Sequence, residues 1–168
     1  GPLPQDGSAN LPPSLLITKL VPFTHAPTNI AGLRPENWTI FGSDKGFQIS
    51  SSPEAPDGFV GKLIMPSDYP AGGAAGASRT TLESLKQNHA DGPAPEIKEE
   101  QTTAEGSTLL VSVSSVAQGS TQPIRMMIYA RTTITSKGVL VAIAVVPADL
   151  FPQEEALVRQ MVDALHAA

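Results

Sequence analysis

Residues 107–147 read STLLVSVSSVAQGSTQPIRMMIYARTTITSKGVLVAIAVVP, and this stretch decides the fold. It contains three apolar runs, 107–118, 123–134 and 139–147, which are separated by short polar connectors. The connectors contain Gly119-Ser120 and Ser136-Lys137-Gly138, which favour hairpin tips because glycine readily adopts positive φ. Connectors this short require antiparallel neighbours, since a parallel crossover needs about a dozen residues or more. The stretch therefore predicts three consecutive antiparallel strands at the centre of a sheet.

The second run alternates with a period of two, as a half-buried strand does. One face carries apolar residues, and the other carries the polar groups: Ile124, Met126, Ile128 and Ala130 against Arg125, Met127, Tyr129 and Arg131. The third run, Val139 to Val146, is apolar on both faces. A strand of that kind is usually covered on both faces, so we expect it to lie centrally in the sheet.

The last segment of the chain predicts a helix that packs on this sheet. It starts near Asp149 or Phe151, and Pro152 falls in the first turn, where its missing N–H is tolerated. Glu154 and Glu155 lie favourably against the helix dipole. One continuous apolar stripe follows: Leu157, Val158, Met161, Val162 and Leu165.

The rest of the chain predicts shorter strands and one more helix. We expect strands at 15–23 (ended by Pro22), 38–41, 46–49 and 59–65, with a bulge at Gly61, and an exposed edge strand at 96–105. Residues 66–77 are expected to form a loop, after which Ser78 or Thr80 caps a mid-chain helix. Strand runs separated from helices indicate an α+β fold, in which an antiparallel meander is covered by the mid-chain and C-terminal helices.

Length and composition indicate how many domains the chain contains. The 168 residues suit one ordinary domain. Gly1-Pro2 is typical of the scar left when a protease removes an expression tag, and the Pro-, Gly- and Ser-rich residues up to 14 have linker composition. We therefore expect a linker over 1–14 and a single α+β domain over 15–168. The linker is expected to be a tether, and its upstream part, before Leu3, is expected to be either a signal or a lipid anchor that places the domain outside the cytoplasm.

Composition also narrows the function classes. The net charge of −5 disfavours general nucleic-acid binding, which requires a basic patch. The chain has no cysteine, which excludes a disulfide framework and a cysteine-based zinc site or nucleophile. Its apolar runs are shorter than the roughly 18 residues of a transmembrane span.

The order of elements resembles the PsbP-like superfamily, which includes the extrinsic subunit of the oxygen-evolving complex and DcrB-like bacterial lipoproteins. The resemblance covers roughly residues 30–168. In addition, Gly32, Pro35 and Trp38 are similar to the G-x-x-P-x-x-W opening of small extracytoplasmic bacterial domains, where a proline turn leads into the first strand. The resemblance implies a non-enzymatic, exported accessory module and no shared catalytic residues.

The candidate binding surface is the polar face of the second strand. It carries Arg125, Tyr129 and Arg131, with the two arginines about 20 Å apart along the strand. Either this face is simply solvated or covered by a helix, or it accepts an anion or docks a protein, since Arg and Tyr are favoured interface anchors. Tyr69 and Arg79 flank the Gly/Ala-rich residues 71–77 and add a second candidate, a loop that folds over a ligand or partner.

We predict no catalytic, cofactor or metal site. His25, His89 and His166 lie far apart in sequence, without a partner at metal-ligand spacing. Residues 71–77 match neither a P-loop nor a dinucleotide-binding motif.

Three functions remain open at this point. The first is a non-catalytic extracytoplasmic protein-interaction or assembly module, which binds another protein at the membrane surface. The second is a small-ligand carrier, which needs an apolar pocket near Tyr69, Leu82 and Leu85 that the Gly/Ala loop closes. The third is an enzyme whose site is scattered across the sheet, and this requires a cleft with at least two titratable groups in contact.

Overall fold

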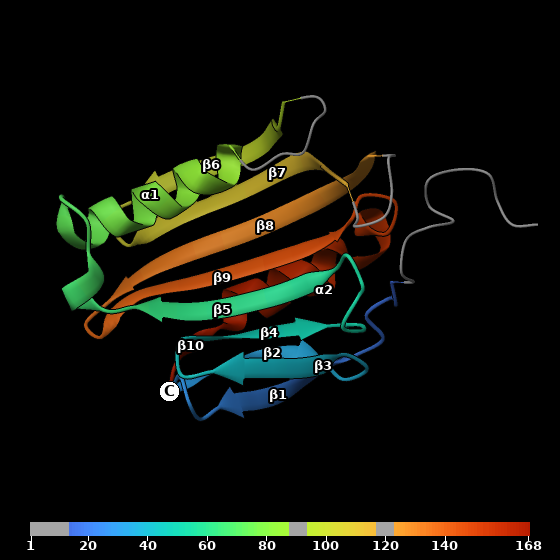
Figure 1. Cartoon of the computed structure of the whole chain (residues 1–168), viewed down its shortest axis with the longest axis horizontal. Coiled ribbons are helices and arrows are strands. Elements are labelled where there is room, and N and C mark those ends of the chain that lie inside the picture. Colours follow the sequence, from blue (N-terminus) through green and yellow to red (C-terminus); the bar gives the residue numbers. More distant parts are fainter. Residues whose placement is uncertain (1–13, 88–93, 117–122) are drawn as a thin grey trace, which may run out of the picture.

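The computed structural model describes residues 14–87, 94–116 and 123–168, which form two antiparallel sheets and two α-helices (Figure 1). In chain order the elements are β1 (Leu20–His25), β2 (Ile30–Pro35), β3 (Thr39–Ser43), β4 (Gly46–Ser50), β5 (Gly58–Ile64), the 3-10 helix η2 (Pro66–Asp68), α1 (Gly73–Gln87), β6 (Glu96–Thr103), β7 (Gly106–Val116), β8 (Pro123–Thr135), β9 (Gly138–Pro147), α2 (Phe151–Ala164) and β10 (His166–Ala167). The large sheet has the order β3-β4-β5-β9-β8-β7-β6, and the small sheet has the order β1-β2-β10. The predicted α+β class is confirmed.

The central meander is confirmed strand by strand. β7 pairs with β8 and β8 with β9, both antiparallel and in continuous register. Thr135 pairs with Gly138, so Ser136 and Lys137 form a two-residue hairpin loop, and Gly138 has the positive φ of +150° that was expected. The other predicted tip, Gly119-Ser120, lies outside the described residues. β9 lies between β5 and β8, which is the central position that its two apolar faces predict.

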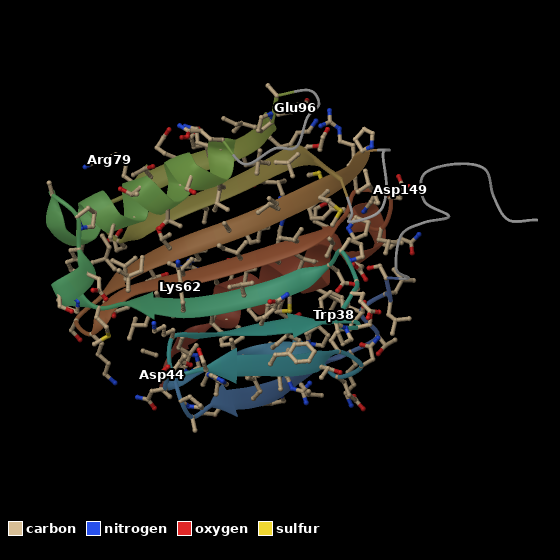
Figure 2. The ribbon with its side chains drawn as sticks, in the orientation of Figure 1. Trp38, Asp44, Lys62, Arg79, Glu96 and Asp149 are labelled. Atoms are coloured by element: carbon tan, nitrogen blue, oxygen red, sulfur yellow. The ribbon has the colours of Figure 1, made fainter. Side chains whose placement is uncertain are left out.

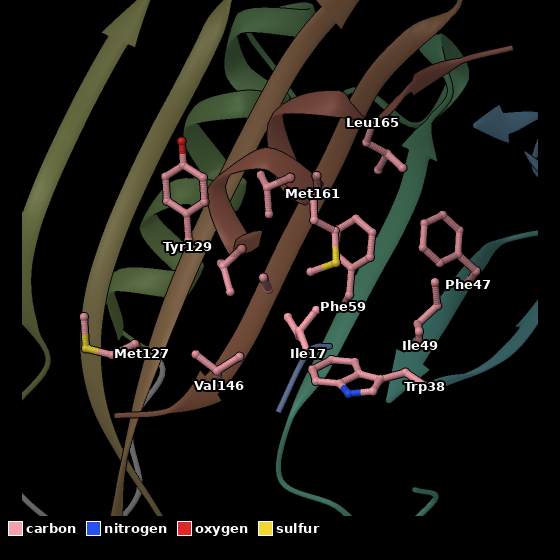
Figure 3. Packing of buried hydrophobic residues seen from close by; sticks show 14 of the residues in the cluster. Ile17, Trp38, Phe47, Ile49, Phe59, Met127, Tyr129, Val146, Met161 and Leu165 are labelled. Atoms are coloured by element: carbon pink, nitrogen blue, oxygen red, sulfur yellow. The ribbon is translucent and has the colours of Figure 1, made fainter. Parts of the chain in front are cut away.

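The alternation along β8 creates two separate helix–sheet interfaces. Met126, Ile128 and Ala130 form one cluster with Leu82 of α1. Met127 and Tyr129 belong to the cluster on the opposite face, which includes Val158, Met161 and Val162 of α2 (Figure 3). Figure 1 shows α1 and α2 on opposite faces of the sheet. The meander is thus covered by both helices, as predicted.

The stripe of α2 packs as expected. Val158, Met161, Val162 and Leu165 are buried, and Leu157 is half-buried against the same cluster. Pro152 lies in the first turn, where its missing N–H leaves no helical hydrogen bond unmade. Burial of each of these side chains contributes roughly 1.5–3 kcal/mol before the entropy of ordering is subtracted.

The start of α1 differs from the prediction. The helix begins at Gly73, inside the stretch that was expected to be a loop, because Ala74, Ala75 and Ala77 have high helix propensity. Ser78 does not cap the helix. Its hydroxyl is buried and shares hydrogen bonds with Ser107 and Thr132 in the sheet below.

The N-terminal strands also differ from the prediction. The strand predicted at 15–23 begins only at Leu20 and continues through Pro22 to His25, because β1 lies at the edge of its sheet, where proline is tolerated. β2 was not predicted. Pro35 closes β2, and Trp38 is buried immediately before β3.

Gly61 is not at a bulge, because β5 keeps a continuous register with β4 and β9. A Cβ at this position would lie 2.3 Å from Cζ of Phe47. The glycine is therefore required by the close approach of the buried Phe47 ring. The exposed edge strand is confirmed, since all eight residues of β6 are exposed.

Neither α1 nor α2 has the length and apolar character that crossing a bilayer requires.

Candidate functional site

A polar groove runs between α2 and the outer strands β6, β7 and β8, on the α2 face of the large sheet. Its volume is about 380 Å³. The floor consists of three cross-strand rows, Glu99–Leu110–Tyr129, Gln101–Thr108–Arg131 and Thr103–Gly106–Thr133. Arg159 and Asp163 of α2 form the wall. The groove exists because α2 contacts β8 and β9 but leaves the β6–β7 side of this face uncovered.

A β-bulge in β6 places one carboxylate in the groove. Ile97 pairs with Val111, but Glu99 pairs with the adjacent Leu110, so one extra residue is inserted between them. Because side chains alternate along a strand, the inserted residue moves Glu99 to the α2 face and Glu100 to the α1 face. The ion pairs agree with this assignment: Glu99 binds Arg159 of α2, and Glu100 binds Lys86 of α1.

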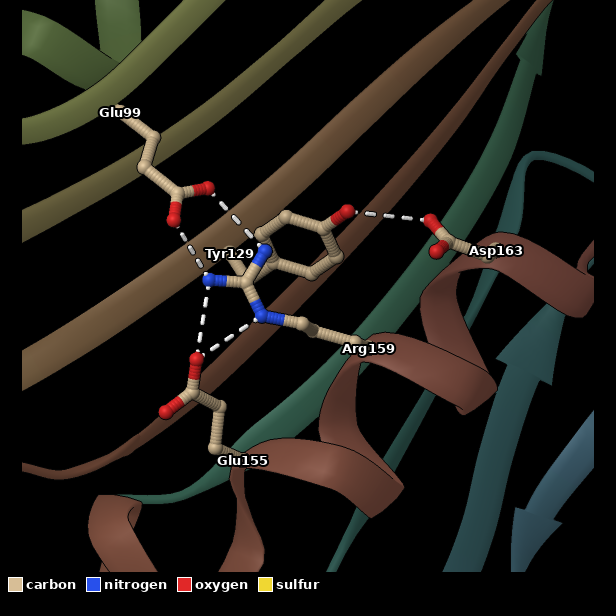
Figure 4. Close-up of polar contacts among 5 residues, drawn as sticks. All are labelled: Glu99, Tyr129, Glu155, Arg159 and Asp163. Carbon is tan, nitrogen blue, oxygen red and sulfur yellow. Dashed lines mark hydrogen bonds and ion pairs between the residues drawn. The ribbon is translucent and has the colours of Figure 1, made fainter.

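Arg159 is the centre of the site (Figure 4). Its Nη1 and Nη2 donate to the two carboxylate oxygens of Glu99 at 3.1 and 2.8 Å, and its Nε donates to Oε2 of Glu155 at 3.0 Å. The guanidinium carbon lies 5.0 Å from the centroid of the Tyr129 ring. The hydrogen bonds that Arg159 donates to Glu99 raise the pKa of Arg159 and lower the pKa of Glu99. The bridge is therefore fully charged at neutral pH.

Tyr129 and Arg131 converge on Asp163. The Tyr129 hydroxyl donates to Oδ1 of Asp163 at 3.1 Å, and Nη1 of Arg131 lies 3.4 Å from the same oxygen. Burial, followed by the charge of Asp163, raises the pKa of the Tyr129 hydroxyl. Tyr129 thus remains a protonated donor, and the residue is only 5% exposed.

The structure brings together two of the five predicted site residues. Tyr129 and Arg131 line the groove. Arg125 lies exposed near the other end of β8, paired in register with Ser114. Tyr69 and Arg79 lie on the α1 side of the sheet, where Tyr69 packs against buried residues of the sheet and helix, and Arg79 is exposed on α1 (Figure 2).

Sequence reasoning missed the residues that complete the groove: Glu99, Arg159 and Asp163. A signal was present for Arg159, because Glu155 and Arg159 have the i,i+4 spacing of a helical ion pair next to the apolar stripe. No comparable signal marks Glu99, since the bulge that orients it depends on pairing with β7.

The predicted absence of a metal site rests on the histidines. His25 is buried, and its Nδ1 shares a hydrogen bond of 2.7 Å with the Thr28 hydroxyl. His166 is exposed, and His89 lies outside the described residues. Within 14–87, 94–116 and 123–168, the structure contains no group of three His, Asp or Glu side chains that could hold a metal ion.

The region expected to hold an apolar ligand is packed. Leu82 is 5% exposed and contacts the cluster of Leu109, Val111 and Val113, and Leu85 packs against the same cluster. Side chains thus occupy the space between α1 and the sheet, which disfavours the carrier hypothesis at this place.

A second polar centre anchors the N-terminal segment beside the start of α2. Glu154 is 2% exposed, and its Oε1 accepts the Ile17 N–H at 2.6 Å, while its Oε2 has no hydrogen-bond partner among the residues that the structure describes. Asp57 accepts hydrogen bonds from the Ser14 hydroxyl and from the backbone N–H of Ser51, the latter at 2.9 Å. Burial is the main cause that raises the pKa of Glu154, and the charge of Asp57 adds to it.

Further contacts fix the same segment from the loop after β2. The indole N–H of Trp38 donates to the carbonyl of Leu15 at 3.3 Å, and the Asn37 amide donates to that of Leu16 at 2.8 Å. Residues 14–17 are thus held without regular secondary structure.

The sequence matches no protein-family model and no curated protein. Solved structures do match. A Ran-binding protein of Saccharomyces cerevisiae, Mog1p, is 11% identical, with a TM-score of 0.53 over 89% of this chain and 95% of its own. Cyanobacterial PsbP (CyanoP) from Synechocystis sp. PCC 6803 is 14% identical, with a TM-score of 0.52 over 90% of this chain and 94% of its own. The chain has a PsbP-like fold.

The PsbP-like fold confirms the resemblance that was predicted from the order of elements. At identities of 11% and 14% the similarity establishes the fold alone. Because one fold can carry unrelated functions, the role of this chain must be argued from its own groove.

Proposed function

We propose that this protein is a non-catalytic protein-interaction or assembly module, and that the groove between α2 and β6–β8 is its binding surface. In this proposal residues 15–168 act as a single domain. The module works outside the cytoplasm, tethered to a membrane through its N-terminal segment, and binds another protein at the membrane surface.

The groove is the observation that carries the proposal. It combines a tyrosine and two arginines, Tyr129, Arg131 and Arg159, with a floor rich in threonine. Arginine is favoured at protein interfaces because it offers several directed hydrogen bonds, and the exposed parts of Arg131 and Arg159 present such groups here beside the buried Tyr129. Their geometry here is preorganised by Glu99, Glu155 and Asp163, so a partner meets side chains that are already ordered.

The ionisation states in the groove disfavour catalysis. A general acid or base works best with a pKa near the operating pH. The pKa of Tyr129 is raised and that of Glu99 is lowered, so both move away from neutrality. The charged groups in contact are held in ion pairs: Arg159 with Glu99 and Glu155, and Arg131 with Asp163.

Protein binding has a precedent in this fold. Mog1p is described as a Ran-binding protein, and its structure matches 89% of this chain. This supports the choice of a binding role over a carrier role, without identifying the partner.

The described start of the N-terminal segment, residues 14–17, and the groove lie toward opposite ends of α2. Ile17 is held by Glu154 in the first turn of α2, whereas Asp163 lies in its last turn. Nine residues of helix separate the two by about 14 Å. A domain held to a membrane by residues before Ser14 would therefore present the groove away from its point of attachment.

Site-specific photo-cross-linking in the native cell tests the proposal. A benzophenone amino acid at Gln101, which lines the groove, is expected to capture a defined protein species. The matched control places the same group at Lys62, which is exposed on the other face of the sheet (Figure 2).

Two conservative substitutions sharpen this test. Thr108→Val and Thr133→Val together are expected to reduce the Gln101 cross-link, because they remove hydroxyls from the floor of the groove without changing its charge. Capture of the same species from Lys62 but not from Gln101 would place the interface elsewhere and refute the proposal.

A further inference from the structure

The groove carries more negative than positive charge. Its lining includes three carboxylates, Glu99, Glu105 and Asp163, and two guanidinium groups, Arg131 and Arg159. Glu155 adds a further carboxylate through its contact with Arg159. The sequence alone highlighted the arginines and left an anion-accepting surface open as one alternative, but the folded chain surrounds them with acids.

Both arginines are already engaged by carboxylates of the chain. Arg159 donates to Glu99 through both terminal nitrogens and to Glu155 through Nε. Arg131 pairs with Asp163. An anionic ligand would have to displace one of these carboxylates and would then lie beside it, with the repulsion that like charges experience.

The carboxylates, in contrast, retain acceptor capacity. An ionised carboxylate offers about four lone-pair sites. Within the described residues, Tyr129 and Arg131 contact Asp163 only through Oδ1, and the Asp163 side chain is 46% exposed. Glu99 is 55% exposed on the opposite side of the groove. Two accessible acceptors therefore face the groove from the edge strand and from the helix.

We propose that the groove receives a segment of the partner protein that carries Lys or Arg side chains, which Glu99 and Asp163 bind. This inference rests on the proposed function and names the chemistry of its partner. Thr108 and Thr133 on the floor supply hydroxyls for the backbone of such a segment. Screening by salt weakens the binding, because the charges involved are exposed.

Peptide titration followed by amide chemical shifts tests the charge preference directly. The probes are two short peptides, one that alternates Thr with Lys and one that alternates Thr with Glu. The Lys peptide is expected to shift the amides of β6–β8 and of the end of α2, with an affinity that falls between about 50 and 500 mM NaCl. Tighter binding of the Glu peptide in the groove would overturn the proposal.

Variants in which amides replace carboxylates show which acidic residues bind the Lys peptide. Glu99→Gln with Asp163→Asn is expected to weaken Lys-peptide binding by about three- to tenfold. The matched control, Asp44→Asn with Asp68→Asn, removes the same charge from exposed positions outside the groove and should change the affinity less than twofold, as roughly expected of screened distant charges. Equal losses in both double variants would show a non-specific charge effect and contradict the inference.

Arg131→Gln distinguishes a cation-accepting groove from an anion-accepting one, because the affinity for the Lys peptide should change in opposite directions. It makes the groove more negative, so a cation-accepting groove gains affinity for the Lys peptide by about two- to threefold. A loss of Lys-peptide affinity in this variant would refute the inference. Thermal unfolding of each variant checks that the fold is retained.

The inference and the proposed function can fail separately. If Gln101 captures a protein and that capture survives Glu99→Gln with Asp163→Asn, the groove is an interface but its partner is not cationic. If Gln101 captures nothing while the Lys peptide still binds in the groove, the charge preference stands and the interaction role falls.

Discussion

The two helix–sheet interfaces of this protein use different side chains, and the difference explains where its groove lies. On the α1 face, Gly76, Ala77 and Ser78 are all buried, so the helix approaches the sheet closely. On the α2 face, Arg159 spans the distance from the helix to Glu99 on the edge strand. Small residues close one interface, whereas a long charged residue bridges the other and leaves a solvent-accessible groove beneath it.

The polar contacts of the two interfaces differ in the same way. The hydroxyls of Ser78, Ser107 and Thr132 are buried and bond to one another beneath α1. The charged side chains of Arg159 and Glu99 beside α2 are partly exposed, to 29% and 55%. Buried hydrogen bonds contribute to stability because an unmade one is costly, whereas exposed ion pairs contribute little. The α1 contacts thus serve the fold, and the α2 contacts remain available for binding.

The largest loss of stability is expected from a substitution in the apolar part of the α2 interface. Met161→Ala removes a side chain that is fully buried, and we expect it to lower the free energy of unfolding by about 2–5 kcal/mol. Urea unfolding measures this. Leu157→Ala, at a half-buried position of the same helix, is the control and should cost clearly less. Equal losses would show that α2 does not pack through the Met161 side of its stripe.

The second-largest loss of stability is expected when a buried hydroxyl of the α1 interface is removed. Ser78→Ala leaves the partners Ser107 and Thr132 with one hydrogen bond fewer, and we expect a loss of about 1–3 kcal/mol in the free energy of unfolding. Tyr129→Phe removes a hydroxyl from the α2 interface, where water can bond to Asp163 instead, and should cost less. A larger loss for Tyr129→Phe would mean that the polar contacts on the α2 face, and not those on the α1 face, stabilise the fold.

The buried carboxyl at the start of α2 predicts a pH effect. The pKa of Glu154 is raised above its ordinary value of 4.5, mainly by burial, so the folded state disfavours its charged form. Its stabilising contribution is complete below pH 4.5 and is lost as the pH rises through the raised pKa of the folded state. Glu154→Gln should therefore stabilise the protein by on the order of 1 kcal/mol at neutral pH.

That gain from Glu154→Gln should shrink as the pH falls toward 4.5, where the native glutamate is protonated as well. Unfolding curves of both proteins across this range measure it. A constant difference between them at every pH would show that the ionisation of Glu154 is not its cause.

The smallest effect on stability is expected in the groove itself. Glu99→Gln weakens an exposed ion pair with Arg159, so the free energy of unfolding should change by less than about 1 kcal/mol, and less still at high salt. Thermal unfolding at low and high salt measures this. A loss as large as that of Ser78→Ala would mean that the Glu99–Arg159 bridge holds the fold together.

The periodic parts of the sequence predicted their structures correctly. Alternation along β8 and the apolar stripe of α2 identify the buried faces without tertiary information, because one side of each element must leave water. Prediction failed where a short segment depends on distant contacts. β2 has a glycine and a proline and little periodicity, and α1 begins in a Gly/Ala stretch that reads equally well as a loop.

The sequence by itself determined the α+β class, the antiparallel meander and the central place of β9, since these follow from local periodicity and connector length. Only the tertiary structure decided which charges meet. Arg159 reaches Glu99, 60 residues away, because a bulge in β6 turns that side chain toward α2. Buried Glu154 binds Ile17 from a distance of 137 residues. Such pairs depend on strand register and helix placement, which act over distances that no local pattern of residues encodes.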